Sequence, residues 1–167
     1  MENHIIIDFT LFYNKYKARL YNYVFKIVRS RMLAEDIVHD VFIKLYDNYS
    51  NIRNLGRIEL WLFKTARNEI YSYFRKKINK YNQDNDCWEQ NASDENISEL
   101  IENKELISIL EHELKLMDRE QSEAYYLKEY SDLSYKEIAD IMDITENLVK
   151  SRIYKVRQKL KRTLESL

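Results

Sequence analysis

Residues 133–161 read LSYKEIADIMDITENLVKSRIYKVRQKLK, and this stretch decides the fold of the C-terminal third of the chain. Glu137 follows Ser134 by three residues, which is the spacing of a helix capping box. Thr145 can cap a second helix, and Glu146 then places an acid in its first turn, where the helix dipole favours one. We therefore expect two short helices joined by a sharp turn just before Thr145.

Apolar residues are spaced so that these two helices pack against each other. They are Ile138, Ala139 and Met142 on the first helix and, on the second helix from about Glu146 to Arg162, Val149, Ile153, Val156 and Leu160. Steps of three and four residues place each set on one helix face, and a pair packed across a short turn is a helix-turn-helix. Asp143 stands at the turn, where a positive φ is expected and glycine is usual. Upstream, Asp118 and Gln121 have the spacing of another capping box.

The opposite face of the second helix is basic and polar, with seven Lys or Arg and one acid in residues 146–162. In a helix-turn-helix, the first residues of this helix meet base edges in the major groove, and flanking basic residues hold phosphates. We expect duplex DNA contacts at Thr145, Glu146, Asn147, Lys150 and Ser151, and backbone contacts at Arg152, Lys155 and Arg157. A basic run alone favours a solvated helix; the caps and the turn spacing favour DNA.

The composition of the whole chain favours an all-α protein. Its 167 residues include no proline and one glycine, Gly56, and tight hairpin turns are hard to build without these residues. A single cysteine, Cys87, excludes a disulfide framework and a thiolate metal cluster. No stretch has the roughly 18 apolar residues of a membrane span. We expect a cytoplasmic protein with no cofactor, no metal and no direct membrane insertion.

Charge is distributed unevenly along the chain, although the net charge is only −1. Residues 1–80 carry 15 Lys or Arg against 8 Asp or Glu, whereas residues 81–120 carry 3 against 12. Residues 79–98 also lack helical periodicity and are rich in amides and acids, which predicts a flexible acidic linker. We therefore expect two small helical domains, 1–78 and 99–167, on either side of that linker.

Helical periodicity predicts three helices in the N-terminal domain, at about residues 8–28, 33–48 and 58–77. The segment 48–56 between the last two is rich in Asn, Ser and Gly, which is typical of a loop. The residues expected to face inward on the third helix are Ile58, Leu62, Ala66, Ile70 and Tyr73.

A second face of this third helix is basic. It follows steps of four, three and four residues through Lys64, Asn68, Tyr71 and Arg75, and Arg67 borders it. Cations hold phosphates, rings stack on bases and amides read base edges, so the stripe suits unpaired DNA, and the loop at its head can receive an extruded base. A solvated helix face explains the stripe equally well. Trp61 lies between the two faces, where core packing is the commoner role.

The second helix carries acids and one histidine on its outer side: Glu35, Asp36, His39 and Asp40. Asp40 can form an ion pair with Lys44 one turn later, as expected on a solvated surface. The same acids also suit a docking face for a basic partner.

Three segments in this order resemble the extracytoplasmic-function class of bacterial RNA polymerase sigma factors. They are AEDIVHDVFIKLYDN at 34–48, WLFKTARNEIYSYFRKK at 61–77 and the helix-turn-helix at 133–161. Members of this family often have Gly at the position of Asp143 and a Gly-Thr pair in place of residues 147–148. These departures lie at the start of the reading helix and leave its sequence preference open.

The resemblance implies a promoter-specificity subunit that has no small-molecule substrate. The N-terminal domain would melt the −10 element and capture its single strand with Trp61 and the basic stripe. The acidic face around Asp36 and Asp40 would dock on the clamp helices of the largest subunit of core RNA polymerase. The C-terminal domain would read the −35 element as duplex near the polymerase flap, and the linker would run toward the RNA exit path. An anti-sigma factor is a further expected partner.

Two other classes of protein share some of these features. A stand-alone helix-turn-helix regulator would use the same C-terminal reader, but such proteins usually need a dimer contact and an effector pocket. An enzyme is disfavoured because a chain with one glycine cannot form a Walker A loop, and His4, His39 and His112 are scattered.

Overall fold

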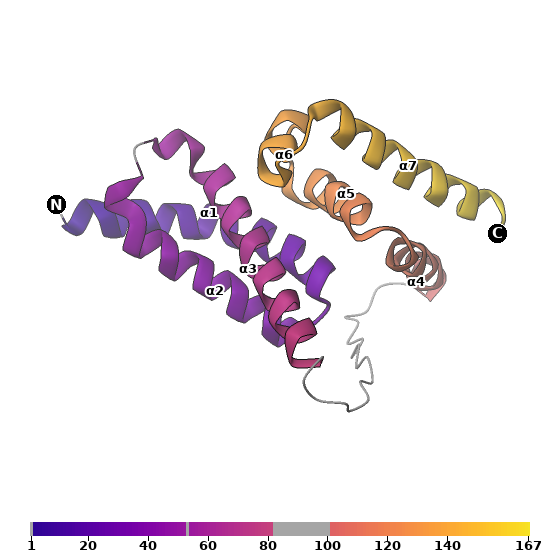
Figure 1. Cartoon of the computed structure of the whole chain (residues 1–167), viewed down its shortest axis with the longest axis horizontal. Coiled ribbons are helices and arrows are strands. Elements are labelled where there is room, and N and C mark those ends of the chain that lie inside the picture. Colours follow the sequence, from indigo (N-terminus) through magenta and orange to yellow (C-terminus); the bar gives the residue numbers. More distant parts are fainter. Residues whose placement is uncertain (1, 53, 82–100) are drawn as a thin grey trace. The chain divides into compact units, whose positions relative to one another are not determined.

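The computed structural model describes residues 2–52, 54–81 and 101–167, and this part of the chain contains helices and turns but no strand (Figure 1). The helices are α1 (Glu2–Val28), α2 (Arg31–Asn48), α3 (Ile58–Tyr81), α4 (Ile101–Leu116), α5 (Arg119–Ser131), α6 (Tyr135–Met142) and α7 (Glu146–Glu165). The chain divides into two compact units, Met1–Ser93 and Asp94–Leu167. The predicted all-α class with two helical domains is confirmed.

In the N-terminal unit, α1, α2 and α3 pack against one another around one core. The turn from α1 to α2 is short because Arg29 adopts a left-handed conformation and the Ser30 hydroxyl accepts a hydrogen bond from the Leu33 amide. Fully buried side chains come from all three helices: Leu20, Tyr23, Val24, Ala34, Val41, Leu45, Leu62, Phe63, Ala66 and Ile70. Burial of each large apolar side chain is worth about 1.5–3 kcal/mol, so this core determines which face of α3 is turned outward.

The predicted loop between α2 and α3 contains two short 3-10 helices, η1 (Tyr49–Asn51) and η2 (Leu55–Arg57). Asn54 organises the turn before α3, because its side-chain oxygen accepts from the Gly56 amide at 3.0 Å and its carbonyl accepts from the Arg57 amide at 3.1 Å. The segment therefore has defined local hydrogen bonds at the head of α3.

In the C-terminal unit, α7 contacts α4, α5 and α6. All of the apolar residues predicted to face inward on the helix-turn-helix are buried: Ile138, Ala139, Met142, Val149, Ile153, Val156 and Leu160. The same core includes Leu127 of α5, Leu133 and Ile141, each at most 1% exposed. The predicted packing of the helix pair is therefore confirmed.

Three details differ from expectation. Tyr73 is 37% exposed, because no described α3 side chain after Ile70 is buried and the last turns of the helix extend beyond the core. Asp118 caps α5 without a capping box: its carboxylate accepts from the Gln121 side-chain amide at 3.1 Å, and its side chain makes no capping hydrogen bond to the backbone. Lys44 forms its ion pair with Glu69 of α3 rather than with Asp40, because tertiary packing brings that carboxylate to it.

The helices of the N-terminal unit are also longer than expected at both ends. The first begins at Glu2 rather than near Asp8, and α3 continues to Tyr81, so residues 79–81 of the expected linker are helical. The rest of that segment, including Cys87, lies outside the described residues. Among the helices that are described, none is both long and apolar enough to cross a membrane.

Candidate nucleic-acid interface

Local hydrogen bonds at three points set the start of α7 and the turn before it. The Ser134 hydroxyl accepts from the Glu137 amide at 3.2 Å and the Glu137 carboxylate accepts from the Ser134 amide at 2.8 Å, which completes the predicted capping box of α6. The Thr145 hydroxyl accepts from the Leu148 amide at 3.3 Å and caps α7. Asp143 ends α6 in the left-handed region (φ 53°, ψ 46°), as the position in the turn predicts.

The N-terminal half of α7 presents a polar face to solvent. Burial of the inner stripe turns the expected base readers outward, and all of them are exposed: Thr145, Glu146, Asn147, Lys150 and Ser151. Lys155, an expected phosphate contact, is exposed as well. A helix of this kind, capped at its start and anchored by apolar residues on the reverse side, suits the major groove of B-DNA.

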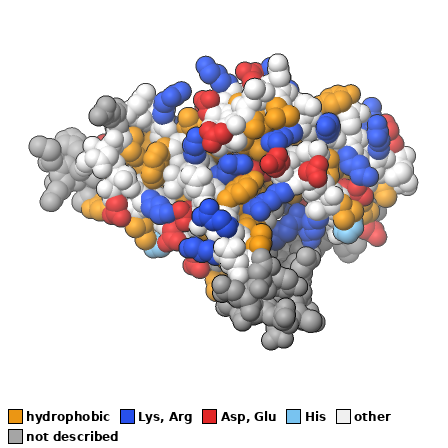
Figure 2. Space-filling view, in the orientation of Figure 1, with side chains coloured by type: hydrophobic (Ala, Val, Ile, Leu, Met, Phe, Trp, Pro, Cys, Tyr) orange, Lys and Arg blue, Asp and Glu red, His pale blue; other side chains and the backbone are white. Residues whose placement is uncertain are grey.

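Several cations of α7 are bound to carboxylates of the same unit. Arg152 pairs with Glu120 of α5 and is only 15% exposed, and Arg157 pairs with Glu129 of α5 at 2.8 Å. The remaining pairs are Lys150 with Glu146, Lys159 with Glu113, and Lys161 with Glu165. The hydrogen bond to Glu129 raises the pKa of the Arg157 guanidinium, so this group stays charged. Figure 2 shows the result: basic and acidic side chains are intermingled on the visible face.

Two cations of α7, Lys155 and Arg162, have no carboxylate partner among the residues that the structure describes. Sequence reasoning also missed Tyr154, whose side chain is 63% exposed. It follows Asn147 and Lys150 by seven and four residues, so it shares their face of the helix. A count of residues along the helix face would have revealed it, but a search for charged side chains passes over it.

The basic stripe of α3 is also turned outward, as predicted. Asn68 and Arg75 are exposed, and the partly exposed Arg67 guanidinium lies over the Tyr71 ring at 4.5 Å from its centroid. Lys64 is partly exposed in the same stripe. These positions form a continuous cationic and aromatic surface along the helix.

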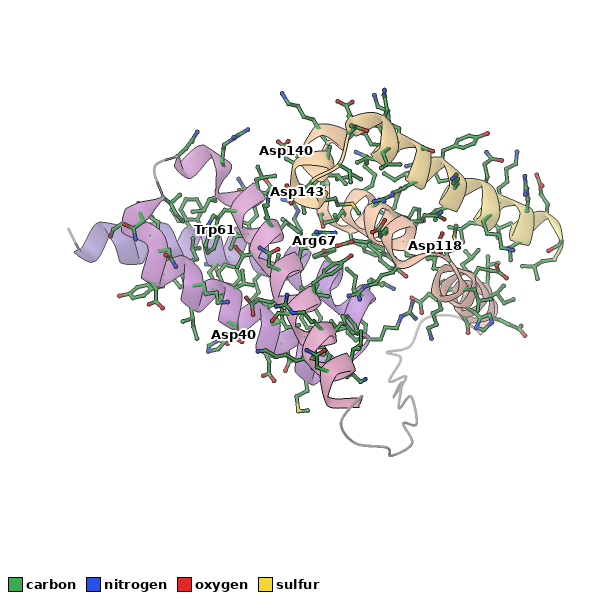
Figure 3. The ribbon with its side chains drawn as sticks, viewed as in Figure 1. Asp40, Trp61, Arg67, Asp118, Asp140 and Asp143 are labelled. Carbon is green, nitrogen blue, oxygen red and sulfur yellow. The ribbon has the colours of Figure 1, made fainter. Side chains whose placement is uncertain are left out.

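Trp61 is partly exposed near the start of α3, and Figure 3 shows it on the same helix as Arg67. Its ring is therefore neither fully buried in the core nor fully solvated. The acids of α3 do not cancel the positive stripe, because each is paired with a neighbouring helix. Glu59 binds Arg19 of α1 at 2.5 Å, and Glu69 binds Lys44 of α2.

The acidic side chains of α2 lie on an exposed face, as expected for Glu35, Asp36, His39 and Asp40. The first three line a cavity of about 640 Å³ between α1 and α2 that also contacts Lys17 and Tyr21. Three large apolar side chains interrupt the acids and were missed by sequence reasoning: Met32 (74% exposed), Ile43 (45%) and Tyr46 (53%). A surface that combines carboxylates with exposed apolar groups suits another protein better than it suits DNA.

The described residues contain no group of three or more His, Cys, Asp or Glu side chains that is arranged to hold a metal ion. The candidate surfaces are therefore two polar, basic helix faces and one acidic-apolar face.

Comparison with known proteins identifies this arrangement. Residues 12–78 match the family Sigma-70 region 2, and residues 107–160 match Sigma-70 region 4. The ECF RNA polymerase sigma factor SigM of Bacillus subtilis is 32% identical over 152 residues, which cover 89% of this chain and 90% of SigM. The chain belongs to the extracytoplasmic-function class of RNA polymerase sigma factors. This sigma factor is an initiation factor that binds core polymerase and promoter DNA, rather than an enzyme or a stand-alone regulator.

Other relatives agree with this assignment. The RNA polymerase sigma factor YlaC of Bacillus subtilis is 26% identical over 156 residues, covering 91% of this chain and 89% of YlaC. Among solved structures, the sigma factor RpoE in complex with the anti-sigma factor NepR from Bartonella quintana has a TM-score of 0.81 at 22% identity. That match covers 95% of this chain and 97% of RpoE. At this identity the structural match supports the fold alone.

Proposed function

We propose that the two units of this sigma factor divide promoter recognition and polymerase binding among three surfaces. The N-terminal unit, residues 1–78, docks on polymerase and melts the −10 element, and the C-terminal unit, residues 99–167, reads the −35 element. Residues 79–98 connect the two as a linker. The observation that carries this proposal is the pair of outward-facing basic helix faces, one on α3 and one on α7, held by separate cores.

Duplex reading is proposed for α7. The exposed residues of its first turns are Thr145, Glu146, Asn147, Lys150 and Ser151, and they contact base edges in the major groove. Lys155, Arg152 and Arg157 hold phosphates, but the last two must first loosen their ion pairs with α5.

Single-strand capture is proposed for α3. The residues proposed for it are Trp61, Lys64, Arg67, Asn68, Tyr71 and Arg75. The stacked pair of Arg67 and Tyr71 offers a flat platform for an unpaired base, and the exposed amide of Asn68 can read a base edge. The loop before α3 receives the extruded base.

Docking on the clamp helices of the largest polymerase subunit is proposed for α2. Glu35, Asp36, His39 and Asp40 supply its negative charge, and the exposed side chains of Met32 and Ile43 supply apolar contact. A cytoplasmic location follows from work with core polymerase. An anti-sigma factor is the further partner that we propose, supported by the complex in which RpoE of Bartonella quintana was solved.

A reciprocal exchange of protein and promoter variants tests this division. Holoenzyme reconstituted with core polymerase selects promoters from genomic DNA, and base pairs are then changed in either the upstream or the downstream element. We expect Lys150→Ala to relax discrimination only upstream and Asn68→Ala only downstream, by roughly 1–3 kcal/mol per base contact. Equal losses at both elements, or none, would contradict the assignment. Failure of saturating protein to open any genomic promoter would contradict the proposed function as a whole.

A further inference from the structure

One stripe of α1 holds both ends of the loop that connects α2 to α3. Its residues are Asp8, Phe12, Tyr16 and Arg19, at steps of four, four and three, which places them on one helix face. Asp8 and Arg19 are 11 residues apart, so they lie about 16 Å from each other along the helix and within about 20° in direction. Neither the basic stripe nor the docking face includes them.

The first end of the loop is tied down by Tyr49, the first residue of η1. Its hydroxyl donates a hydrogen bond of 2.8 Å to the Asp8 carboxylate, 41 residues away in sequence, and its ring lies 6.5 Å from that of Phe12. Burial and the neighbouring Asp8 carboxylate raise the pKa of the Tyr49 hydroxyl, so it stays a donor at neutral pH. A hydrogen bond to a charged acceptor is stronger than a neutral one.

The second end of the loop is tied down at the start of α3. Arg19 forms an ion pair of 2.5 Å with Glu59, and the neighbouring Ile58 is 1% exposed in the core. The Arg19 guanidinium also lies over the Tyr16 ring, at 5.9 Å from its centroid, which restricts its position. The loop is thus held at both ends by the same rigid helix, and this removes conformations that free ends would sample.

We propose that Asp8 and Arg19 are positioning residues for promoter melting: they hold the loop ready to accept the first extruded base. The proposal rests on the assignment of single-strand capture to the loop and α3. An unpaired base costs a few kcal/mol to extrude, and a receiving site that is already ordered avoids a further ordering cost at that step. Removing either tie should therefore slow melting without affecting how the sigma factor binds polymerase or upstream duplex.

The test uses holoenzyme reconstituted from the full chain and core polymerase on a selected promoter. Asp8→Ala and Tyr49→Phe each remove one side of the hydrogen bond, and Asp8→Asn keeps an oxygen acceptor. We expect the first two to slow formation of the open complex by about tenfold, as measured by the reactivity of unpaired thymines, and the third to stay near the parent rate. The double variant Asp8→Ala with Tyr49→Phe should be no slower than either single variant. Arg19→Gln should slow opening at the other end of the loop.

A promoter whose −10 element is already unpaired by mismatches separates positioning from general damage. On that template the variants should recover the parent rate, because no base has to be extruded. Asn14→Ala, at an exposed α1 position away from the stripe, is the matched control and should change neither rate. Equal slowing on paired and unpaired templates, or loss of affinity for core polymerase in proportion to the slowing, would overturn the proposal. If Asn68→Ala and replacement of Asn54 in the loop also leave melting unchanged, the assignment of single-strand capture fails instead.

Discussion

Releasing Arg157 from its carboxylate should make the sigma factor bind duplex DNA more tightly. Arg157 and Glu129 are 2.8 Å apart, and their side chains are 50% and 39% exposed. An ion pair this exposed is worth about 0.2–1 kcal/mol after solvent screening. If Arg157 must leave Glu129 to reach a phosphate, Glu129→Gln removes that cost, and the dissociation constant should fall by about 1.4- to 5-fold.

Salt dependence provides a second reading of the same variant. A cation freed for phosphate contact adds up to about 0.9 to the slope of log affinity against log salt concentration. Both quantities are measured by fluorescence anisotropy of a duplex that carries the selected upstream element, titrated with the full chain at several salt concentrations. Glu165→Gln is the control: it makes the same charge change in an ion pair with Lys161, at the opposite end of α7. Equal tightening by both variants would show a general charge effect, and weaker binding by Glu129→Gln would show that the pair positions Arg157 instead of competing with DNA.

Three further outcomes are expected. Asp40→Lys reverses a charge on the exposed face of α2, so it should weaken binding to core polymerase while leaving duplex binding intact; equal losses in both assays would contradict a docking role. Ser134→Ala removes the capping box of α6 and should lower the free energy of unfolding by about 1 kcal/mol in urea, whereas no change would show that the cap is dispensable. Asp132→Gly should raise that free energy by about 0.5–1 kcal/mol, because Asp132 is left-handed (φ 52°) and glycine adopts this conformation without strain; a loss of stability would refute that reasoning.

Features that depend on neighbouring residues in the sequence were predictable. The capping box of Ser134 and Glu137, the cap at Thr145 and the left-handed turn at Asp143 are each set by residues within one helical turn, so their spacing alone identifies them. Helix faces were predictable for the same reason wherever a core covers them. Tyr73 was not, because periodicity cannot show where the core ends.

Contacts between distant residues were beyond prediction from the sequence. Arg152 and Glu120 are 32 residues apart, and Tyr49 and Asp8 are 41 apart, so only the tertiary fold shows that they meet. For the candidate sites this difference matters. The sequence identifies the basic residues of α7, but it does not show that five of its seven cations have a carboxylate partner, a count made over the described residues.

The paired cations of α7 have a consequence for how a promoter is chosen. A reader whose charges are largely occupied has little affinity for duplex DNA of arbitrary sequence, since that affinity comes mostly from free cations. In the proposed arrangement, two such weak readers on one chain act together, and binding of the first raises the effective concentration of the second. Their discrimination energies then add, so a site that offers only one matching element is released quickly. Weakness in each part is what makes the whole sigma factor selective.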